Sequence, residues 1–295
     1  MYHRIADPAF DPWDLSVSPA NFEAQVRWLQ KEYTIVTMQQ VQYFVQGGDI
    51  PDRSVCISFD DAYLDNYEIA LPILERYKMP ACFFVPGYFV EQHLSFWWDE
   101  LTDIIFSQAI QNPENSAAWN SWRWPAPTPD RYCRQLITNW EKLRPLTYDE
   151  IRFELDQLKE TIGYKTPAAL GLLPMTSTQL ANAGNTGLIE LGVHTQTHPF
   201  LPDHEKEIQK QEIAHNAAWL KEFPGAMTNI IAYPYGAYNA ETLAVAKGLG
   251  FLLGFTTKAQ TVHQGLPALE LGRFQVKNWT AMEFEAQLVN WLMNY

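Results

Sequence analysis

The sequence has few cysteines and few positive charges. Only Cys56, Cys82 and Cys133 occur in 295 residues, and no C-x-x-C pair is present. No disulfide framework is therefore predicted, which suits a reducing compartment. Lysine and arginine number 21 against 34 acidic residues, for a net charge of −13. This charge argues against nucleic acid and anionic membrane surfaces as partners, because both would repel the chain.

Long apolar runs are also lacking. No segment approaches the ~18 uninterrupted apolar residues of a membrane span, and "MYHRIADPAF" has no charged region followed by the apolar stretch of a signal peptide. We therefore expect no membrane span and a cytoplasmic location. Hydrophobic residues make up 47% of the chain, which predicts a large core rather than disorder. None of these features indicates an oligomeric state.

What the sequence does contain is an alternation of short apolar runs and amphipathic helices. "SPANFEAQVRWLQKEY" predicts a helix with Ser18 as N-cap and Pro19 at the first helical position. "SVCISF", "ACFFV", "GLIELGV", "NIIAYP" and "FLLGFTT" are typical of buried strands, "LDNYEIALPILERY" of a helix, and a terminal helix begins at about Ala281. This order predicts an α/β fold with a parallel sheet or barrel.

The alternation stops between about residues 95 and 187. This region holds six of the eleven tryptophans, Trp97, Trp98, Trp119, Trp122, Trp124 and Trp140. It also holds a helix opened by Thr147 with Glu150 three residues later, a capping box. We expect one domain over residues 1–295 with a mostly helical insertion at about 95–187. The insertion either covers one barrel face or forms a wall of the site, where its tryptophan rings could bind a sugar.

Polar residues follow three of the predicted strands. "CISFDDAYLDN" carries Asp60 and Asp61 directly after a buried strand, and adjacent carboxylates in a dry pocket need a cation or donors. They are candidates for one metal ligand and one base. "LGVHTQTHP" carries His194 and His198, which on a helical turn would point the same way and could bind one ion. Taken singly, each motif also fits an ordinary cap or turn.

The third motif is "IAYPYGAYN", in which a strand end leads through Pro-Tyr-Gly into a helix. Such a loop can present a backbone N–H inward, as an oxyanion donor would require. Proline and glycine also explain it as a plain β-to-α turn.

Together, F-D-D, H-T-x-x-H-P and P-Y-G resemble the polysaccharide deacetylases of carbohydrate esterase family 4. The resemblance implies a distorted (β/α)7 barrel and metal-dependent removal of an acetyl group from an N-acetylated sugar or polysaccharide. It implies Asp61, His194 and His198 as metal ligands, Asp60 as general base and the Tyr235 N–H as oxyanion donor. Two imidazoles and one carboxylate leave room on Zn²⁺ for water and substrate. We therefore expect a divalent metal, zinc above others, and an N-acetylated carbohydrate as partner.

Two positions depart from the family pattern. The usual arginine two residues before Pro-Tyr is replaced by Ala232, and we expect Arg273 in "LGRFQV" to bring a guanidinium to the substrate site instead. No late L-x-H segment carries the acid histidine. "MYHRI" resembles the rearranged subgroup related to poly-N-acetylglucosamine deacetylases, which implies His3 as the acid. For this role His3 must point at the metal while Tyr2 faces the other way, as alternation along a strand requires.

Three other functions compete with deacetylation. Two histidines and one carboxylate also fit non-haem Fe(II) oxygenases, although those enzymes are built from all-β sheets and this chain reads as βα units. A catalytically inactive carbohydrate-binding relative on the same barrel is a second alternative. A hydrolase of another non-peptide C–N bond is a third. A metal titration combined with an acetate-release assay distinguishes deacetylation from an oxygenase and from a binding protein.

Overall fold

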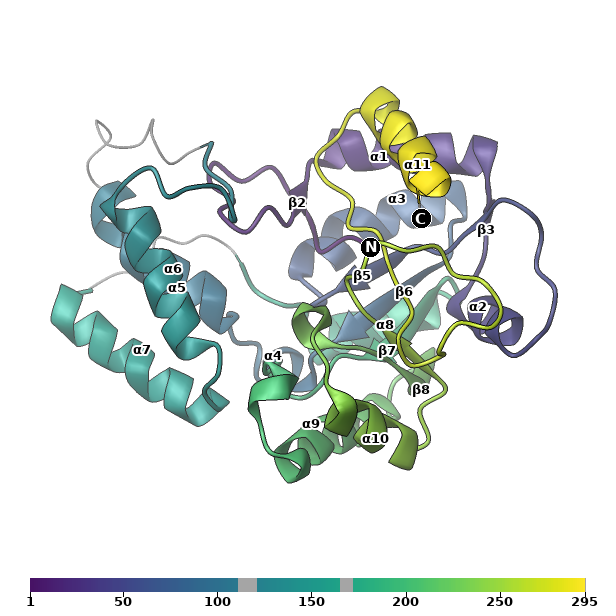
Figure 1. Cartoon of the computed structure of the whole chain (residues 1–295). Helices are drawn as coiled ribbons and strands as arrows, with labels where there is room; N and C mark the ends of the chain where they lie inside the picture. The colour runs from purple at the N-terminus through teal and green to yellow at the C-terminus, as the bar shows by residue number, and fades with distance from the viewer. Residues whose placement is uncertain (111–120, 165–171, 295) are drawn as a thin grey trace.

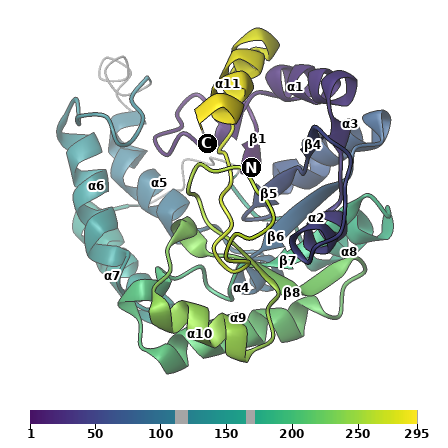
Figure 2. The ribbon, with the colours of Figure 1, turned by 45° about the vertical axis from the view of Figure 1, so that its right-hand side comes forward.

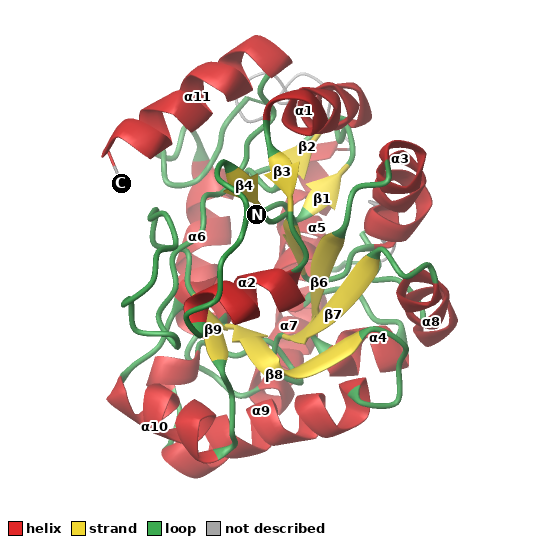
Figure 3. Ribbon diagram, turned by 90° about the vertical axis from the view of Figure 1, so that its right-hand side faces the viewer, coloured by secondary structure: helices red, strands yellow, loops and turns green. Residues whose placement is uncertain are grey.

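The computed structural model describes residues 1–110, 121–164 and 172–294. Its main sheet consists of five parallel strands whose spatial order follows the sequence (Figure 1). The strands are β5 (Ser58–Asp60), β6 (Ala81–Val85), β7 (Ile189–Val193), β8 (Ala226–Ala232) and β9 (Leu253–Phe255). The sheet curls, and helices surround its outer face (Figure 3).

Two irregular segments close the open side of this sheet. Tyr2 forms a parallel bridge with Phe59 beside β5, and Leu271 forms one with Phe255 beside β9. The segments also meet each other, since the Val276 N–H donates to the carbonyl of Met1 at 2.9 Å. Five regular strands and two irregular ones therefore make up the distorted barrel that the sequence predicts.

The outer layer contains most of the predicted helices. They are α1 (Pro19–Glu32), α2 (Met38–Val45), α3 (Leu71–Tyr77), α8 (Ser177–Asn185), α9 (Lys206–Leu220), α10 (Ala240–Gly248) and α11 (Ala281–Asn294). Ser18 caps α1 by accepting from the Asn21 N–H at 3.3 Å. α1 buries Phe22, Val26 and Leu29, and α11 packs against it (Figure 2). None of the described helices combines the length and apolar character needed to cross a lipid bilayer.

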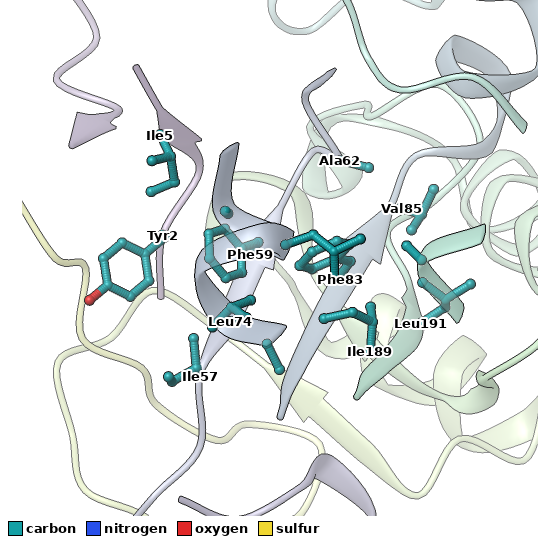
Figure 4. Packing of buried hydrophobic residues seen from close by; sticks show 14 of the residues in the cluster. Tyr2, Ile5, Ile57, Phe59, Ala62, Leu74, Phe83, Val85, Ile189 and Leu191 are labelled. Atoms are coloured by element: carbon teal, nitrogen blue, oxygen red, sulfur yellow. The ribbon is translucent and has the colours of Figure 1, made fainter. Parts of the chain in front are cut away.

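Large apolar side chains fill the space between the barrel sheet and its outer helices, where the Phe22 ring of α1 lies 5.7 Å from the Phe59 ring. The Phe59 and Phe83 rings meet edge to face with centroids 5.2 Å apart, and Leu191 lies beyond them (Figure 4). All three side chains are fully buried. Replacing such a phenylalanine with alanine typically costs ~3–5 kcal/mol of stability, so this packing fixes the positions of the strand ends that follow it.

A second group of helices includes α5 (Trp97–Ile110), α6 (Arg131–Leu143) and α7 (Tyr148–Ile162), which stand to one side of the barrel, and the short α4 (Gly87–Gln92) beside the barrel (Figure 1). The predicted capping box opens α7, where the Thr147 N–H donates to the Glu150 carboxylate at 2.9 Å. These helices enclose a separate apolar core that includes Phe89, Leu101 and Leu136.

Two predicted elements differ from the structure. "SVCISF" does not form one strand: β4 (Ser54–Val55) pairs with β3 (Thr34–Ile35) in a small separate sheet, and only β5 joins the barrel. The chain changes pairing partner at Cys56, which an apolar run cannot reveal. "LDNYEIALPILERY" begins with a π-helical turn over Asn66–Ala70 before α3. Pro72 near the start of α3 has no N–H to donate, which favours this irregularity.

Candidate metal centre

Three potential metal ligands converge at the carboxyl ends of the barrel strands. Asp61 follows β5, and His194 and His198 follow β7. The Nε2 atoms of His194 and His198 lie 3.5 and 3.4 Å from Oδ1 of Asp61. One ligand atom from each residue lies within 4.8 Å of the others, and all three residues are buried. The sequence-predicted ligand set is thus brought together.

The chemistry of these side chains fits a divalent cation. Oδ1 of Asp61 is buried and has no hydrogen-bond partner among the described residues. Nδ1 of His194 lies 2.7 Å from the carbonyl of Ala232, a contact that orients the ring with Nε2 toward Asp61. Burial lowers the pKa of His198 to about 3, so its ring is neutral and can offer a lone pair. Two imidazoles and a carboxylate are a typical three-ligand zinc set with open positions.

The loop between the two histidines is not the helical turn that the spacing predicts. Thr195 and His198 have left-handed backbone angles, with φ of 62° and 56°. The loop is instead held by its own side chain, since the His198 N–H donates to Oγ1 of Thr195 at 3.2 Å. The two imidazoles converge because the loop folds back sharply, not because they lie one helical turn apart.

Helix α9 holds this loop from outside. The Glu212 carboxylate accepts hydrogen bonds from the backbone N–H groups of Gln196 and Thr197, at 2.9 and 2.8 Å, and from the Thr197 hydroxyl at 2.7 Å. One turn later, Oδ1 of Asn216 accepts from the N–H of His194 at 2.9 Å. Residues i and i+4 share one helix face, so α9 presents both acceptors to the loop. The sequence analysis did not identify either residue, although the four-residue spacing of Glu212 and Asn216 on a predicted helix indicates two polar groups on one face.

The second aspartate is paired with a distant arginine. The two terminal nitrogens of Arg273 each lie 2.7 Å from a carboxylate oxygen of Asp60, and the guanidinium contacts the Phe84 ring at 5.3 Å. Burial raises the pKa of Asp60, but the Arg273 charge and hydrogen bonds together with the nearby histidines hold that pKa well below its usual range. The guanidinium beside Asp60 therefore comes from Arg273.

His3 lies near this pair, on the irregular N-terminal segment that runs beside β5. Tyr2 points outward, where its hydroxyl donates to Gln25 of α1 at 3.0 Å. The next residue, His3, is half-buried and lies within the electrostatic field of Asp60 and Asp61. Its carbonyl accepts from Nδ2 of Asn66 at 2.8 Å. Burial lowers the pKa of the His3 imidazole despite the two carboxylates.

Tyr235 lies over the ligands from the turn after β8. Its backbone is left-handed, with φ 59° and ψ 6°, and its ring centroid is 4.8 Å from that of His198. At Gly236, which has φ 67°, a Cβ would come within 2.4 Å of the Thr257 backbone nitrogen. Only glycine therefore allows the Pro-Tyr-Gly turn to approach the barrel this closely.

The tryptophans of the insertion have a different role from the one predicted for most of them. Trp97, Trp98 and Trp122 are at most 5% exposed, so their faces are occupied by protein. The Trp98 ring lies 4.6 Å from the His198 ring at a tilted angle and donates its Nε1–H to the Tyr63 hydroxyl at 3.0 Å. Trp98 therefore forms part of the inner wall of the site. Trp140 is half-buried, and Trp119 lies outside the described residues.

Comparison with known proteins agrees with this geometry. The family model "Polysaccharide deacetylase" matches residues 47–254. The poly-beta-1,6-N-acetyl-D-glucosamine N-deacetylase of Staphylococcus aureus (strain MSSA476) is 40% identical over 106 residues, and the match spans 35% of each chain. The aligned region is thus about a third of that relative's length.

Solved structures of similar shape cover nearly the whole chain. Deacetylase PplD of Streptococcus pyogenes, in complex with acetate, has a TM-score of 0.64 at 20% identity, over 97% of this chain and 95% of that one. IcaB from Ammonifex degensii has a TM-score of 0.63 at 22% identity, over 98% and 94%. At such identities these two likenesses establish the fold, whereas the family-model match covers most of the sequence. The chain therefore belongs to the polysaccharide deacetylase family.

Proposed function

We propose that this chain is a metal-dependent hydrolase that removes the acetyl group from an N-acetylated sugar of a carbohydrate. The observation that carries the proposal is the meeting of Asp61, His194 and His198 beside the Asp60–Arg273 pair. The ligand set alone would also suit an oxygenase. A buried, ionised carboxylate next to it supplies the base that hydrolysis needs.

We propose Zn²⁺ as the resident ion, held by Asp61, His194 and His198. When bound, such an ion polarises an amide carbonyl and lowers the pKa of water. Asp60 then accepts the proton of the attacking water at a carboxylate oxygen. Arg273 keeps Asp60 ionised and fixes the plane of its carboxylate through two hydrogen bonds.

The remaining roles fall to His3 and Tyr235. The backbone N–H of Tyr235 donates to the oxygen that becomes negative as the amide carbonyl is attacked. The departing amine must be protonated before it leaves, and His3, on the strand beside Asp60, is the donor. The direction of its side chain supports this role, because alternation turns His3 inward when Tyr2 faces α1.

The proposed substrate class rests on the family and on the name of the Staphylococcus aureus relative. We propose a polymer or oligomer of N-acetylglucosamine, with β-1,6 linkage as the first candidate. Residues 1–295 would act as one domain, with the insertion at about 95–187 forming a wall of the site. Trp98 on α5, which packs against His198, supports this arrangement.

The test is acetate release by the purified chain. The protein is stripped with a chelator, reloaded with Zn²⁺ and supplied with β-1,6- and β-1,4-linked N-acetylglucosamine oligosaccharides. Zinc-dependent acetate release without oxygen supports the proposal. Binding of sugar with no acetate from any oligosaccharide would indicate the inactive relative. Activity that requires Fe(II) and oxygen would indicate an oxygenase.

A further inference from the structure

An arginine stands between two aromatic rings close to the metal centre. Arg144 follows α6, and its guanidinium carbon lies 3.9 Å from the Phe200 ring centroid and 5.4 Å from that of Trp140. Trp140 and Arg144 are four residues apart on one helix face, and Phe200 follows the His198 loop. The group thus joins the insertion to the barrel.

This group lies one aromatic ring away from a proposed metal ligand. The Tyr235 ring centroid lies 5.8 Å from that of Phe200 and 6.1 Å from that of Trp140, and on its other side it is 4.8 Å from His198. Arg144, Trp140, Phe200 and Tyr235 are all partly accessible, whereas the metal ligands are buried. We call Arg144, Trp140 and Phe200 the rim group.

The hydrogen-bonding capacity of Arg144 is largely unused. Within residues 1–110, 121–164 and 172–294, its Nε is buried and has no hydrogen-bond partner. Its nearest acid is Asp203, whose Oδ2 lies 3.7 Å from Nη2, which is beyond hydrogen-bond distance. The Phe200 and Trp140 rings beside the guanidinium limit its movement, so little further ordering is needed for it to bind a ligand.

We propose that the rim group binds an anionic substituent, a carboxylate or phosphate, on the carbohydrate whose acetyl group lies at the metal centre. This inference rests on the proposed function for the position of the substrate. A sugar hydroxyl accepts through a single oxygen, whereas a carboxylate or phosphate accepts two parallel hydrogen bonds from a guanidinium. A guanidinium of limited movement with free donors therefore favours the anion. The surrounding chain carries a net charge of −13, so this cation also offsets the repulsion that an anionic substrate would meet.

The test compares matched substrates. N-acetylglucosamine oligosaccharides bearing carboxymethyl ethers are compared with those bearing neutral hydroxyethyl ethers. A third set bears phosphates on hydroxyl groups that are not part of the glycosidic linkage. The measured quantity is the ratio of kcat/KM for each anionic substrate to kcat/KM for the neutral one. We expect wild type to favour at least one anionic set by about tenfold, since a charge-assisted bidentate contact is worth ~1.5–3 kcal/mol.

Three variants test whether Arg144 causes the preference for anionic substrates. Arg144→Gln should reduce the ratio to near one, because it removes the charge and the planar fork. Asp203→Asn should raise the ratio, because it removes the acid that competes for the guanidinium. Arg134→Gln removes an exposed positive charge from the same helix and should leave the ratio unchanged. An equal fall in Arg134→Gln and Arg144→Gln would overturn the inference, since net charge alone would then explain the preference.

Binding separates this inference from the proposed function. If no oligosaccharide releases acetate, the proposed function fails. Calorimetric titration with the same oligosaccharides still tests whether the rim group binds an anionic substituent. Tighter binding of an anionic set that Arg144→Gln abolishes would support it. Equal binding of neutral and anionic sets by wild type, or a preference that survives Arg144→Gln, would refute it. The two anionic sets show whether carboxylate or phosphate is the better ligand.

Discussion

Arg273 binds both carboxylate oxygens of Asp60 at 2.7 Å, although 213 residues separate the two side chains. Both are buried, so each charge depends on the other. In a family whose usual arginine comes from the segment before Pro-Tyr, this chain brings the guanidinium from the closing segment of the barrel. The proposed base and its partner can therefore be tested as a pair.

Asp60→Asn should retain zinc and lose turnover by ~10²–10⁴-fold, since a positioned base contributes about that much. Arg273→Gln should also lose turnover, and in addition should destabilise the fold by ~3–5 kcal/mol, because it leaves a buried carboxylate unpaired. The double variant should regain much of the stability but none of the activity. Denaturant unfolding and acetate release measure the two effects. Additive losses of stability would mean that the pair is not coupled.

The proposed metal site predicts that replacing one ligand removes the bound zinc. His194→Ala should lose bound zinc and acetate release while keeping the fold, because one of three buried ligands is gone. Metal content after dialysis and circular dichroism give the two readings. His263→Ala is the matched control, since His263 is exposed on a loop and should keep both metal and activity. Stoichiometric zinc in His194→Ala would refute the ligand assignment.

His3 makes a prediction that depends on the leaving group. His3→Ala should bind zinc normally and release acetate far more slowly from N-acetyl sugars, by ~10²-fold or more. The loss should shrink for activated acetate esters, whose leaving groups need no proton. Parallel rates on amide and ester substrates provide the measurement. An equal loss on both would show that His3 positions other groups and does not donate the proton.

Glu212 should control metal affinity from outside the ligand set. Glu212→Ala removes the acceptor for two loop N–H groups and the Thr197 hydroxyl. Outer-shell partners of metal ligands typically contribute ~10–100-fold in affinity, so the zinc Kd should rise by about that factor. Glu207→Gln, an exposed change on the same helix, is the control. A lower melting temperature of the metal-free protein with an unchanged zinc Kd would indicate a purely structural role.

Asp99 predicts a pH dependence of stability. Burial raises the pKa of this carboxyl to about 7, although the nearby Arg4 charge opposes the rise. An acid with a raised folded-state pKa binds more protons folded than unfolded, so stability falls as pH increases from about 4 through about 7. Asp99→Asn should remove this fall and be more stable than wild type at pH 8 by a few kcal/mol. A parallel pH–stability curve for the variant would contradict the assignment.

Local sequence patterns predicted much of the fold. The N-cap at Ser18, the capping box at Thr147 and the start of α11 are all present, because each depends on neighbouring residues. The break at Cys56 was not predictable, since it reflects which distant strand each half of the run meets.

The candidate site also has features that could be predicted from the sequence and features that could not. Asp61, His194 and His198 could be grouped through the resemblance to the polysaccharide deacetylases, and the position of each motif after a buried strand was consistent with that grouping. The left-handed loop between the histidines could not be foreseen, because Glu212 and Asn216 impose it from a helix packed against it. Nor could composition separate tryptophans that line the inner wall, such as Trp98, from ones that reach the surface.

The way the barrel closes has a consequence for how relatives of this chain are classified. The region that matches the family model, residues 47–254, contains the three candidate ligands and Asp60, but neither His3 nor Arg273. The proposed metal ligands and the proposed base therefore share one stretch of sequence, whereas the proposed acid and the arginine that pairs with the base lie in two flanking stretches that can diverge independently. Two homologues with identical motifs could differ completely in turnover if one of them had lost the histidine or the arginine of the two segments that close the barrel. Active and inactive family members can therefore be distinguished only by comparing the segments that correspond to His3 and Arg273, which lie outside the region of the family model.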